Sequence, residues 1–171
     1  MPDVEKTATL SIPNEAARLA ETRLFVRSFL MDVEASEEDV FEILVAVEEA
    51  ATNALRHGGQ PTGDGLIGIR CVYTPAEFIV QVIDDGVGFK YRPLEHREMP
   101  DPLAPGGRGL FLMNRLMDRV DISSSGRGTT VTMTKPLHGQ DDTPAEMARD
   151  RTYGFDTGNI ELHRLDDQGR R

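Results

Sequence analysis

Glu49 supplies a carboxylate, which can accept a proton, and Asn53 supplies an amide, which can form hydrogen bonds. Both lie on one side of an expected helix. They stand four residues apart, so they share a face one helical turn apart. The apolar residues of the segment follow a stripe nearly opposite: Val40, Leu44, Val47, Ala51 and Leu55. The pair therefore belongs to a solvated face, unless another segment packs closely against the small residues Ala46 and Ala50 beside it.

A second polar motif, Asp84-Asp85-Gly86-Val87-Gly88, follows an alternating apolar segment over 78–83. Glycines at alternate positions allow a tight turn and a close approach of the backbone to a ligand. Asp84, at the end of the expected strand, can accept a hydrogen bond from an amino group held there. An ordinary turn from strand to loop is the alternative, because so short a motif also arises by chance.

Two more glycine runs lie further along the chain. Gly106-Gly107-Arg108-Gly109-Leu110 opens an expected helix, where free N–H groups and the positive dipole end favour phosphate. A hinge is the alternative, and the run matches neither a Walker A loop nor a dinucleotide-binding fingerprint. Gly126-Arg127-Gly128-Thr129-Thr130 predicts a hairpin turn whose threonine hydroxyls can still face a ligand.

The N-terminal elements are an edge strand and a helix. Weak alternation over 7–12 predicts the strand. Pro13 and Asn14 then supply a stop and a helix N-cap. The helix over 15–31 is expected to bury a stripe of apolar residues, Ala17, Ala20, Leu24 and Met31, which Phe25 and Phe29 broaden.

The remaining elements carry the polar motifs. A second helix begins after the capping hydroxyl of Ser36, has three acids in its first turn, and ends between His57 and Gly58. Periodicity then predicts a hairpin of strands over 65–73 and 78–83, a short helix over 110–117, and strands over 119–123 and 129–135. The segment 89–105 shows no periodicity, and a loop this long is usually functional or disordered.

Composition indicates one globular domain in a reducing compartment. The 171 residues can bury a single core, and the formal net charge of −10 argues against a general nucleic-acid or anionic-membrane surface. Cys71 is the only cysteine, and its place in an alternating strand indicates packing rather than reactivity. No membrane span or signal peptide is evident, so a cytoplasmic protein is expected.

The segment 138–171 differs in character from the rest of the chain. It is polar and acidic, with few apolar residues: Tyr153, Phe155, Ile160, Leu162 and Leu165. The composition is typical of a tail or of an extension that docks on a partner.

In combination, these motifs are far more specific than any one of them. Their order resembles the GHKL ATP-binding superfamily, which includes the histidine kinases. Within it the chain resembles the anti-sigma-factor serine/threonine kinases. The closest matches are Glu-Ala-x-Thr-Asn-Ala at 49–54, Asp-Asp-Gly-Val-Gly-Phe at 84–89 and Gly-Gly-Arg-Gly-Leu-Phe-Leu-Met at 106–113. The resemblance covers residues 7 to 136 and implies an ATP-binding kinase domain over 1–137. The implied fold is α+β, a Bergerat-type two-layer sandwich with a mixed, mostly antiparallel sheet and helices on one face.

The resemblance also implies roles for single residues. Asn53 would ligate the Mg²⁺ that bridges ATP phosphates, and Glu49 would be the general base for the acceptor hydroxyl. Asp84 would bind the adenine amino group. The other nucleotide-binding residues would be Gly86 and Gly88 beside the adenine, Gly107, Arg108, Gly109 and Leu110 at the phosphates, and Thr130 near the adenine. Family members often carry a basic residue where this chain has Pro105-Gly106, so Arg108, Lys90, Arg92 or Arg97 would meet the phosphate charge instead.

The implied function is an ATP-dependent serine/threonine kinase that acts on an anti-sigma-factor antagonist and also binds a sigma factor. Such proteins are typically homodimers. The alternative is a non-catalytic module that uses nucleotide to sequester a regulatory partner, and the presence of both Glu49 and Asn53 favours the enzyme. A histidine kinase catalytic domain fits less well, because no dimerising helix with a phosphoacceptor histidine precedes the motifs.

Overall fold

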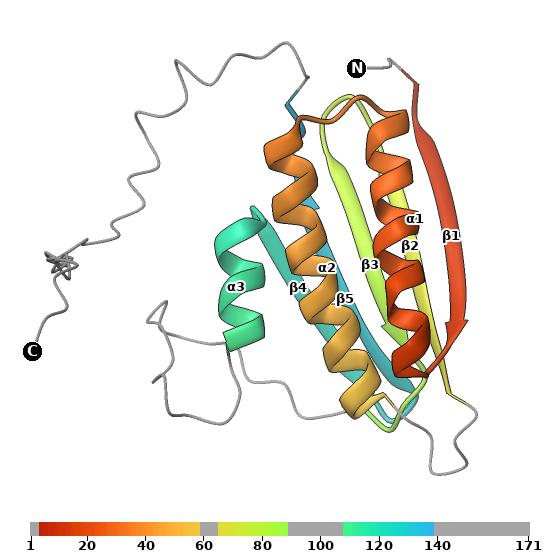
Figure 1. Ribbon diagram of the computed structural model, residues 1–171. Helices are drawn as coiled ribbons and strands as arrows, with labels where there is room; N and C mark the ends of the chain where they lie inside the picture. Colours follow the sequence, from red (N-terminus) through yellow and green to blue (C-terminus); the bar gives the residue numbers. More distant parts are fainter. Residues whose placement is uncertain (1–3, 59–64, 89–107, 139–171) are drawn as a thin grey trace, which may run out of the picture.

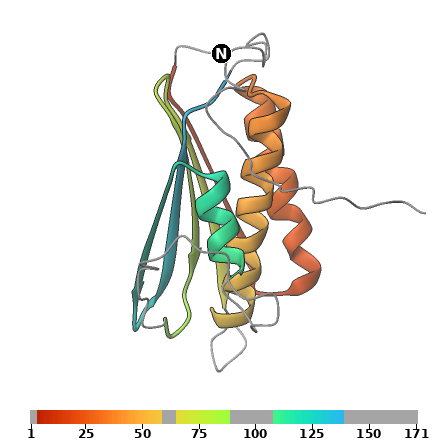
Figure 2. The ribbon, with the colours of Figure 1, turned by 90° about the vertical axis from the view of Figure 1, so that its left-hand side faces the viewer.

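The computed structural model describes residues 4–58, 65–88 and 108–138, which form two layers (Figure 1). The elements in chain order are β1 (Lys6–Pro13), the 3-10 turn η1 (Ala16–Arg18), α1 (Leu19–Asp32), α2 (Glu37–His57), β2 (Leu66–Tyr73), β3 (Phe78–Asp84), α3 (Arg108–Leu116), β4 (Arg119–Ser125) and β5 (Gly128–Lys135). Figure 2 shows the sheet on one side and the α-helices on the other. The predicted α+β sandwich with helices on one face is confirmed.

The strands form one sheet in the order β1-β2-β3-β5-β4. All four pairings are antiparallel. The sequence predicted a mixed, mostly antiparallel sheet, and the described strands contain no parallel pair. Two hairpins account for most of this topology, and β1 lies at one edge as expected. Every second residue of β2 and β3 is buried against the helices, which fixes the register of the sheet.

Helix α1 buries a different face from the one predicted. Its buried residues are Thr22, Val26, Phe29 and Leu30, and the Phe29 ring lies 5.9 Å from the ring of Phe78 on β3. Leu24 and Met31, which the sequence placed in the core, are 65% and 58% exposed. The prediction is wrong because α1 has apolar residues on two faces, and only contact with the sheet decides between them.

The buried face of α2 is also rotated from the predicted stripe. Its buried apolar residues are Ile43, Ala46, Val47, Ala50, Ala51 and Ala54, whereas Val40, Leu44 and Leu55 are only half-buried. Alanines dominate because α2 packs against α1, the sheet and α3 at once. Glu49 and Asn53 therefore flank the buried face rather than oppose it.

The two predicted helix caps have different outcomes. The Ser36 hydroxyl accepts a hydrogen bond from the Asp39 N–H at 3.1 Å, so the start of α2 is confirmed. Asn14 caps no helix: Glu15 is the N-cap of η1, and the Asn14 N–H donates to the Gly65 carbonyl at 2.8 Å. The backbone of Asn14 instead ties the end of β1 to the start of β2.

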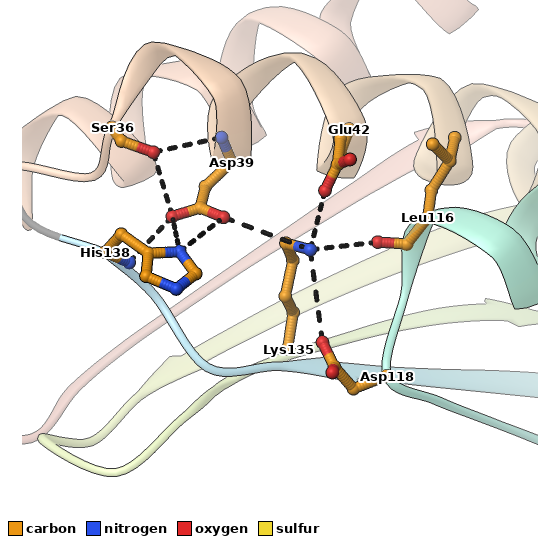
Figure 3. A network of polar contacts seen from close by, with 7 residues as sticks. All are labelled: Ser36, Asp39, Glu42, Leu116, Asp118, Lys135 and His138. Carbon is orange, nitrogen blue, oxygen red and sulfur yellow. Dashed lines mark hydrogen bonds and ion pairs between the residues drawn. The ribbon is translucent and has the colours of Figure 1, made fainter. Parts of the chain in front are cut away.

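A buried ionic cluster joins β5 to the first turns of α2 (Figure 3). The Lys135 ammonium is 2.6 Å from a Glu42 oxygen, lies 3.9 Å from both Asp39 and Asp118, and donates to the Leu116 carbonyl. Lys135 is 1% exposed, so its charge depends on these partners. The cluster anchors the helix layer to the sheet at the end where α2 begins.

Three further predictions concern Cys71, membrane-spanning helices and the C-terminal segment. Cys71 is buried in β2, and burial raises the pKa of its thiol to about 12, as expected for a packed residue. No helix in the described ranges is long and apolar enough to cross a membrane. The predicted tail lies outside the described residues beyond His138, and the division of the chain at 137 stays a prediction.

Candidate functional site

A cavity of about 320 Å³ lies between α2, α3 and the helix-facing side of the sheet. Its walls are mostly apolar, with a few polar groups, which is the usual composition of a small-molecule site. The lining residues are Ala50, Asn53, Ala54, His57, Val82, Asp84, Gly109, Leu110, Met113, Ile122, Thr129 and Val131. The structure thus brings Asn53, Asp84, Gly109 and Leu110 to one place, although they are up to 57 positions apart in the chain.

Asp84 is the buried carboxylate of this cavity, only 8% exposed at the end of β3. Its Oδ1 atom accepts hydrogen bonds from the N–H groups of Gly86 and Thr129, at 3.0 Å and 3.2 Å. These two backbone donors fix the orientation of the carboxyl group. Asp84 is therefore held as an oriented hydrogen-bond acceptor on the cavity wall.

The turn after Asp84 packs against the end of α2. A Cβ atom on Gly86 would lie 2.6 Å from the Cα of Gly58, so there is no room for a side chain at position 86. The same holds at position 58, where a Cβ atom would lie 2.5 Å from the Asp84 side chain. Gly58 also closes α2, where its N–H donates to the Ala54 carbonyl. Gly86 thus positions Asp84 through a backbone contact. Gly88, further along, has a φ of +67° and approaches Ser125 rather than the cavity lining.

Glu49 and Asn53 meet the first turn of α3 at Gly109. A Cβ atom on Gly109 would lie 2.6 Å from the Glu49 Oε2 atom and 3.5 Å from the Asn53 Nδ2 atom. Both side chains, one turn apart on α2, therefore point to the same glycine. Arg108 begins α3 beside them and is exposed, while Gly107 lies outside the described residues.

The two threonines of the last glycine turn point to opposite faces of the sheet. Thr129 pairs with Asp84 and lines the cavity, with its hydroxyl 3.0 Å from the Ser124 hydroxyl. Thr130 pairs with Ile83, which faces away from the helices. The resemblance had implied Thr130 near the adenine, whereas the alternation of the strand brings Thr129, and not Thr130, to the cavity wall.

Comparison with protein families identifies the chain. The family model of the histidine kinase-like ATPase domain matches residues 12–135. The chain belongs to the histidine kinase-like ATPase family. The matched range includes every described element from the end of β1 to β5, and thus all of the cavity.

Two curated relatives of this ATPase domain show what it is similar to. The serine-protein kinase RsbW of Bacillus velezensis is 31% identical over 138 residues, covering 77% of this chain and 86% of that protein. The anti-sigma F factor of Clostridium acetobutylicum is 33% identical over 119 residues, covering 66% and 81%. The predicted resemblance to the anti-sigma-factor kinases of the superfamily is confirmed.

A solved structure confirms the fold of this ATPase domain. The crystal structure of the RsbU and RsbW domains of a Mycobacterium tuberculosis protein superposes with a TM-score of 0.57 at 22% identity. The match covers 76% of this chain and 32% of that one, and at such identity it speaks for the fold alone.

Several residues that line the cavity are not among the site residues that the sequence predicted. His57 shares a helix face with Asn53 four residues earlier, so the sequence places it beside the predicted pair but gives it no role in the site. Ile122 and Val131 are paired across β4 and β5, and they line the cavity because both face the helices. Only knowledge of the strand register would have found these two.

Proposed function

We propose that this chain transfers the γ-phosphate of ATP to a serine or threonine of an anti-sigma-factor antagonist, and that it also binds a sigma factor. The names of the relatives, serine-protein kinase and anti-sigma F factor, support the proposal. The observation that carries it is the meeting of Glu49 and Asn53 at Gly109, on the border of a cavity that contains Asp84.

The cavity fits the base of a nucleotide. Its volume lies in the range of small-molecule sites, and its apolar walls suit a flat heteroaromatic ring. With Oδ1 of Asp84 committed to two backbone donors, the other carboxylate oxygen accepts from the adenine amino group. Thr129 adds a hydroxyl beside it, and Gly86 keeps the turn in place.

The residues near α3 fit the phosphate end. Asn53 offers a hard oxygen ligand, and Mg²⁺ typically takes only one or two ligands from protein when it also binds phosphates and water. Bound Mg²⁺ would supply charge neutralisation. The start of α3, with Arg108, Gly109 and Leu110, presents N–H groups to phosphate, and Gly107 would precede them.

Glu49 is placed to act as general base. Its carboxylate lies within one helical turn of Asn53 and beside Gly109, where an acceptor hydroxyl would approach the phosphates. The carboxylate takes the hydroxyl proton as the oxygen bonds to the γ-phosphorus and the bond to the ADP oxygen breaks. The role of Glu49 as general base therefore distinguishes a kinase from a non-catalytic nucleotide-binding module.

A transfer assay with a matched control tests the proposal. Glu49→Gln should remove the proton acceptor and lower the rate of phosphate transfer from labelled ATP to the antagonist by about 100-fold or more. Glu48→Gln is the control, because Glu48 is exposed and paired with Arg23 away from the cavity. Both variants should bind ATP like the native chain. Failure of the native protein to label the antagonist, despite ATP binding, would establish the non-catalytic alternative.

The setting of the activity belongs to the same proposal. We propose a cytoplasmic homodimer with no nucleic-acid partner, on the strength of the resemblance and the net charge of −10. Sedimentation equilibrium of the full chain, with and without ATP and Mg²⁺, measures the oligomeric state. A monomer at all concentrations would remove the dimer from the proposal and leave the kinase assignment intact.

A further inference from the structure

The outer side of the helix layer carries large apolar side chains that the sheet does not cover. We call the outer helical face the surface formed by Leu24 and Met31 of α1 and Phe41 of α2. Leu24 is 65%, Met31 58% and Phe41 66% exposed. Leu24 and Met31 are seven residues apart, so they lie in one row along α1. This row is part of the stripe that the sequence predicted for the core.

The two helices present these residues on the same side. Arg23 and Glu48 form an ion pair of 3.2 Å that bridges α1 and α2 at the solvent-facing side. Leu24 follows Arg23, and Phe41 lies two turns before Glu48 on the same face of α2. Single exposed apolar residues are common, but several large ones on one side indicate a surface that another segment covers.

The structure also shows where the C-terminal segment starts. The His138 carbonyl accepts a hydrogen bond from the Ser36 N–H at 3.0 Å, and the His138 N–H donates to Asp39 at 2.7 Å. The imidazole Nδ1 atom lies 3.1 Å from the same Asp39 carboxylate (Figure 3). Leu137 packs on the core just before. His138 is therefore fixed at the junction of α1 and α2. Its partner Ser36 is five positions from Met31 and five from Phe41 along the chain.

From this anchor the remaining residues have the reach and the composition to cover the face. Fourteen residues separate His138 from Tyr153, enough to span roughly 45 Å when extended, whereas all of α1 is about 21 Å long. The segment carries apolar side chains in an otherwise polar context: Tyr153, Phe155, Ile160, Leu162 and Leu165. The connection of 14 residues is therefore long enough to bring these apolar side chains to Leu24.

We propose that residues 139–171 turn back from His138 and cover the outer helical face of the same molecule with their apolar side chains. A protein partner that uses this face must first displace the segment, so the extension competes with partners for the surface. The proposal does not depend on kinase activity, because it concerns a face on the opposite side of the helix layer from the sheet.

Paramagnetic labelling of the full-length chain tests this proposal. Ser28→Cys places a nitroxide beside the outer helical face at an exposed position, and Ser123→Cys places one on the outward side of β4, at the far edge of the sheet. Cys71 is buried, so labelling is directed to the introduced cysteine. The label at position 28 should cause loss of amide signals from the region 153–165, restored on reduction, and the label at 123 should leave them intact.

Two further samples decide who covers the face. Adding Leu24→Ser and Met31→Ser to the Ser28→Cys chain should restore the signals, and these exposed substitutions leave the core unchanged. In a mixture of labelled unenriched chain and unlabelled isotope-enriched chain, the signals should stay intact. Signal loss in that mixture would show that a second copy covers the face. Equal effects of the labels at 28 and 123, or none from either, would overturn the proposal.

Discussion

Gly109→Ala is the substitution that tests the geometry of the site most directly. Gly109 lies in the first turn of α3, and the added Cβ would be 2.6 Å from the Glu49 Oε2 atom. Ordinary contacts of a Cβ begin near 3.4 Å, so the carboxylate must retreat by about 1 Å. The Asn53 amide, at 3.5 Å, is already at an ordinary distance and stays in place. The variant therefore moves the proposed base and spares the proposed metal ligand.

The expected magnitude follows from this displacement. A misplacement of about 1 Å in a reacting group costs up to roughly 100-fold in rate. We expect phosphate transfer to fall by about 10- to 100-fold, or about 1.4–2.7 kcal/mol in activation free energy. Alanine is a better helix former than glycine by up to about 1 kcal/mol, so the variant should unfold no more easily than the native chain.

Three measurements on the same protein separate the contributions. Single-turnover transfer to the antagonist gives the rate, calorimetric titration gives ATP affinity, and thermal unfolding gives stability. Gly126→Ala is the matched control, because a Cβ at Gly126 meets no atom within 4 Å in the turn between β4 and β5. It should match the native chain in all three.

A double substitution sharpens the test. If Gly109→Ala acts by moving Glu49, then combining it with Glu49→Gln should reduce transfer no further than Glu49→Gln alone. Native-like transfer by Gly109→Ala would refute the placement of Glu49 as the base. Equal losses of ATP affinity and transfer rate would refute it too, because they would mean that the glycine acts on nucleotide binding.

Other regions of the structure give further predictions. Asp84→Asn keeps an oxygen for the two backbone donors but loses the charge facing the cavity, so ATP affinity measured by calorimetry should fall about 10-fold or more while the thermal midpoint changes little. Lys135→Met leaves the buried Glu42 carboxylate without its ammonium partner and should lower the free energy of unfolding in urea by about 3–5 kcal/mol. The same change at Lys6, paired with exposed Asp32, should cost about 1 kcal/mol or less, and equal losses would contradict the burial argument. Burial raises the pKa of the Cys71 thiol from 9.0 to about 12, so between these pH values the folded chain keeps the thiol proton that the unfolded chain has lost. The free energy of unfolding should therefore fall by about 1.4 kcal/mol per pH unit in this range. Cys71→Ala should remove this contribution of the thiol to the pH dependence of unfolding.

The buried polar groups divide the molecule into two ends with different tasks. Lys135, Glu42 and Asp39 stabilise the end where α2 begins. Buried Asp84, with half-buried Asn53 across the cavity, lies at the end where α2 finishes. At the first end, a buried lysine and two acids join the helix layer to the sheet. The cavity forms at the other end, where small residues on α2 let α3 and the sheet stand apart.

Much of this architecture follows from local patterns in the sequence. Alternation marked the hairpin that became β2 and β3, and the hydroxyl of Ser36 with its acidic successors marked the start of α2. These features are determined within a few residues, because a pleat has period two and a cap bonds to the next turn. For the same reason, the spacing of Glu49 and Asn53 already placed them on one helix face.

Tertiary contacts decided what local patterns left open. The stripe through Leu24 and Met31 was as regular as the one that is buried, and only the position of the sheet selected the face with Val26 and Phe29. Likewise, the sequence could not choose between Thr129 and Thr130, because the register against Asp84 fixes which one faces the helices.

The sequence alone determined the order of the polar and glycine motifs along the chain and predicted that they form one site. Only the tertiary structure decided that Gly109 of α3 meets Glu49 and Asn53 of α2, and that Asp84 faces the same cavity. The physical reason is that a side chain's direction follows from its own helix or strand, whereas its neighbours depend on how α2, α3 and the sheet pack together.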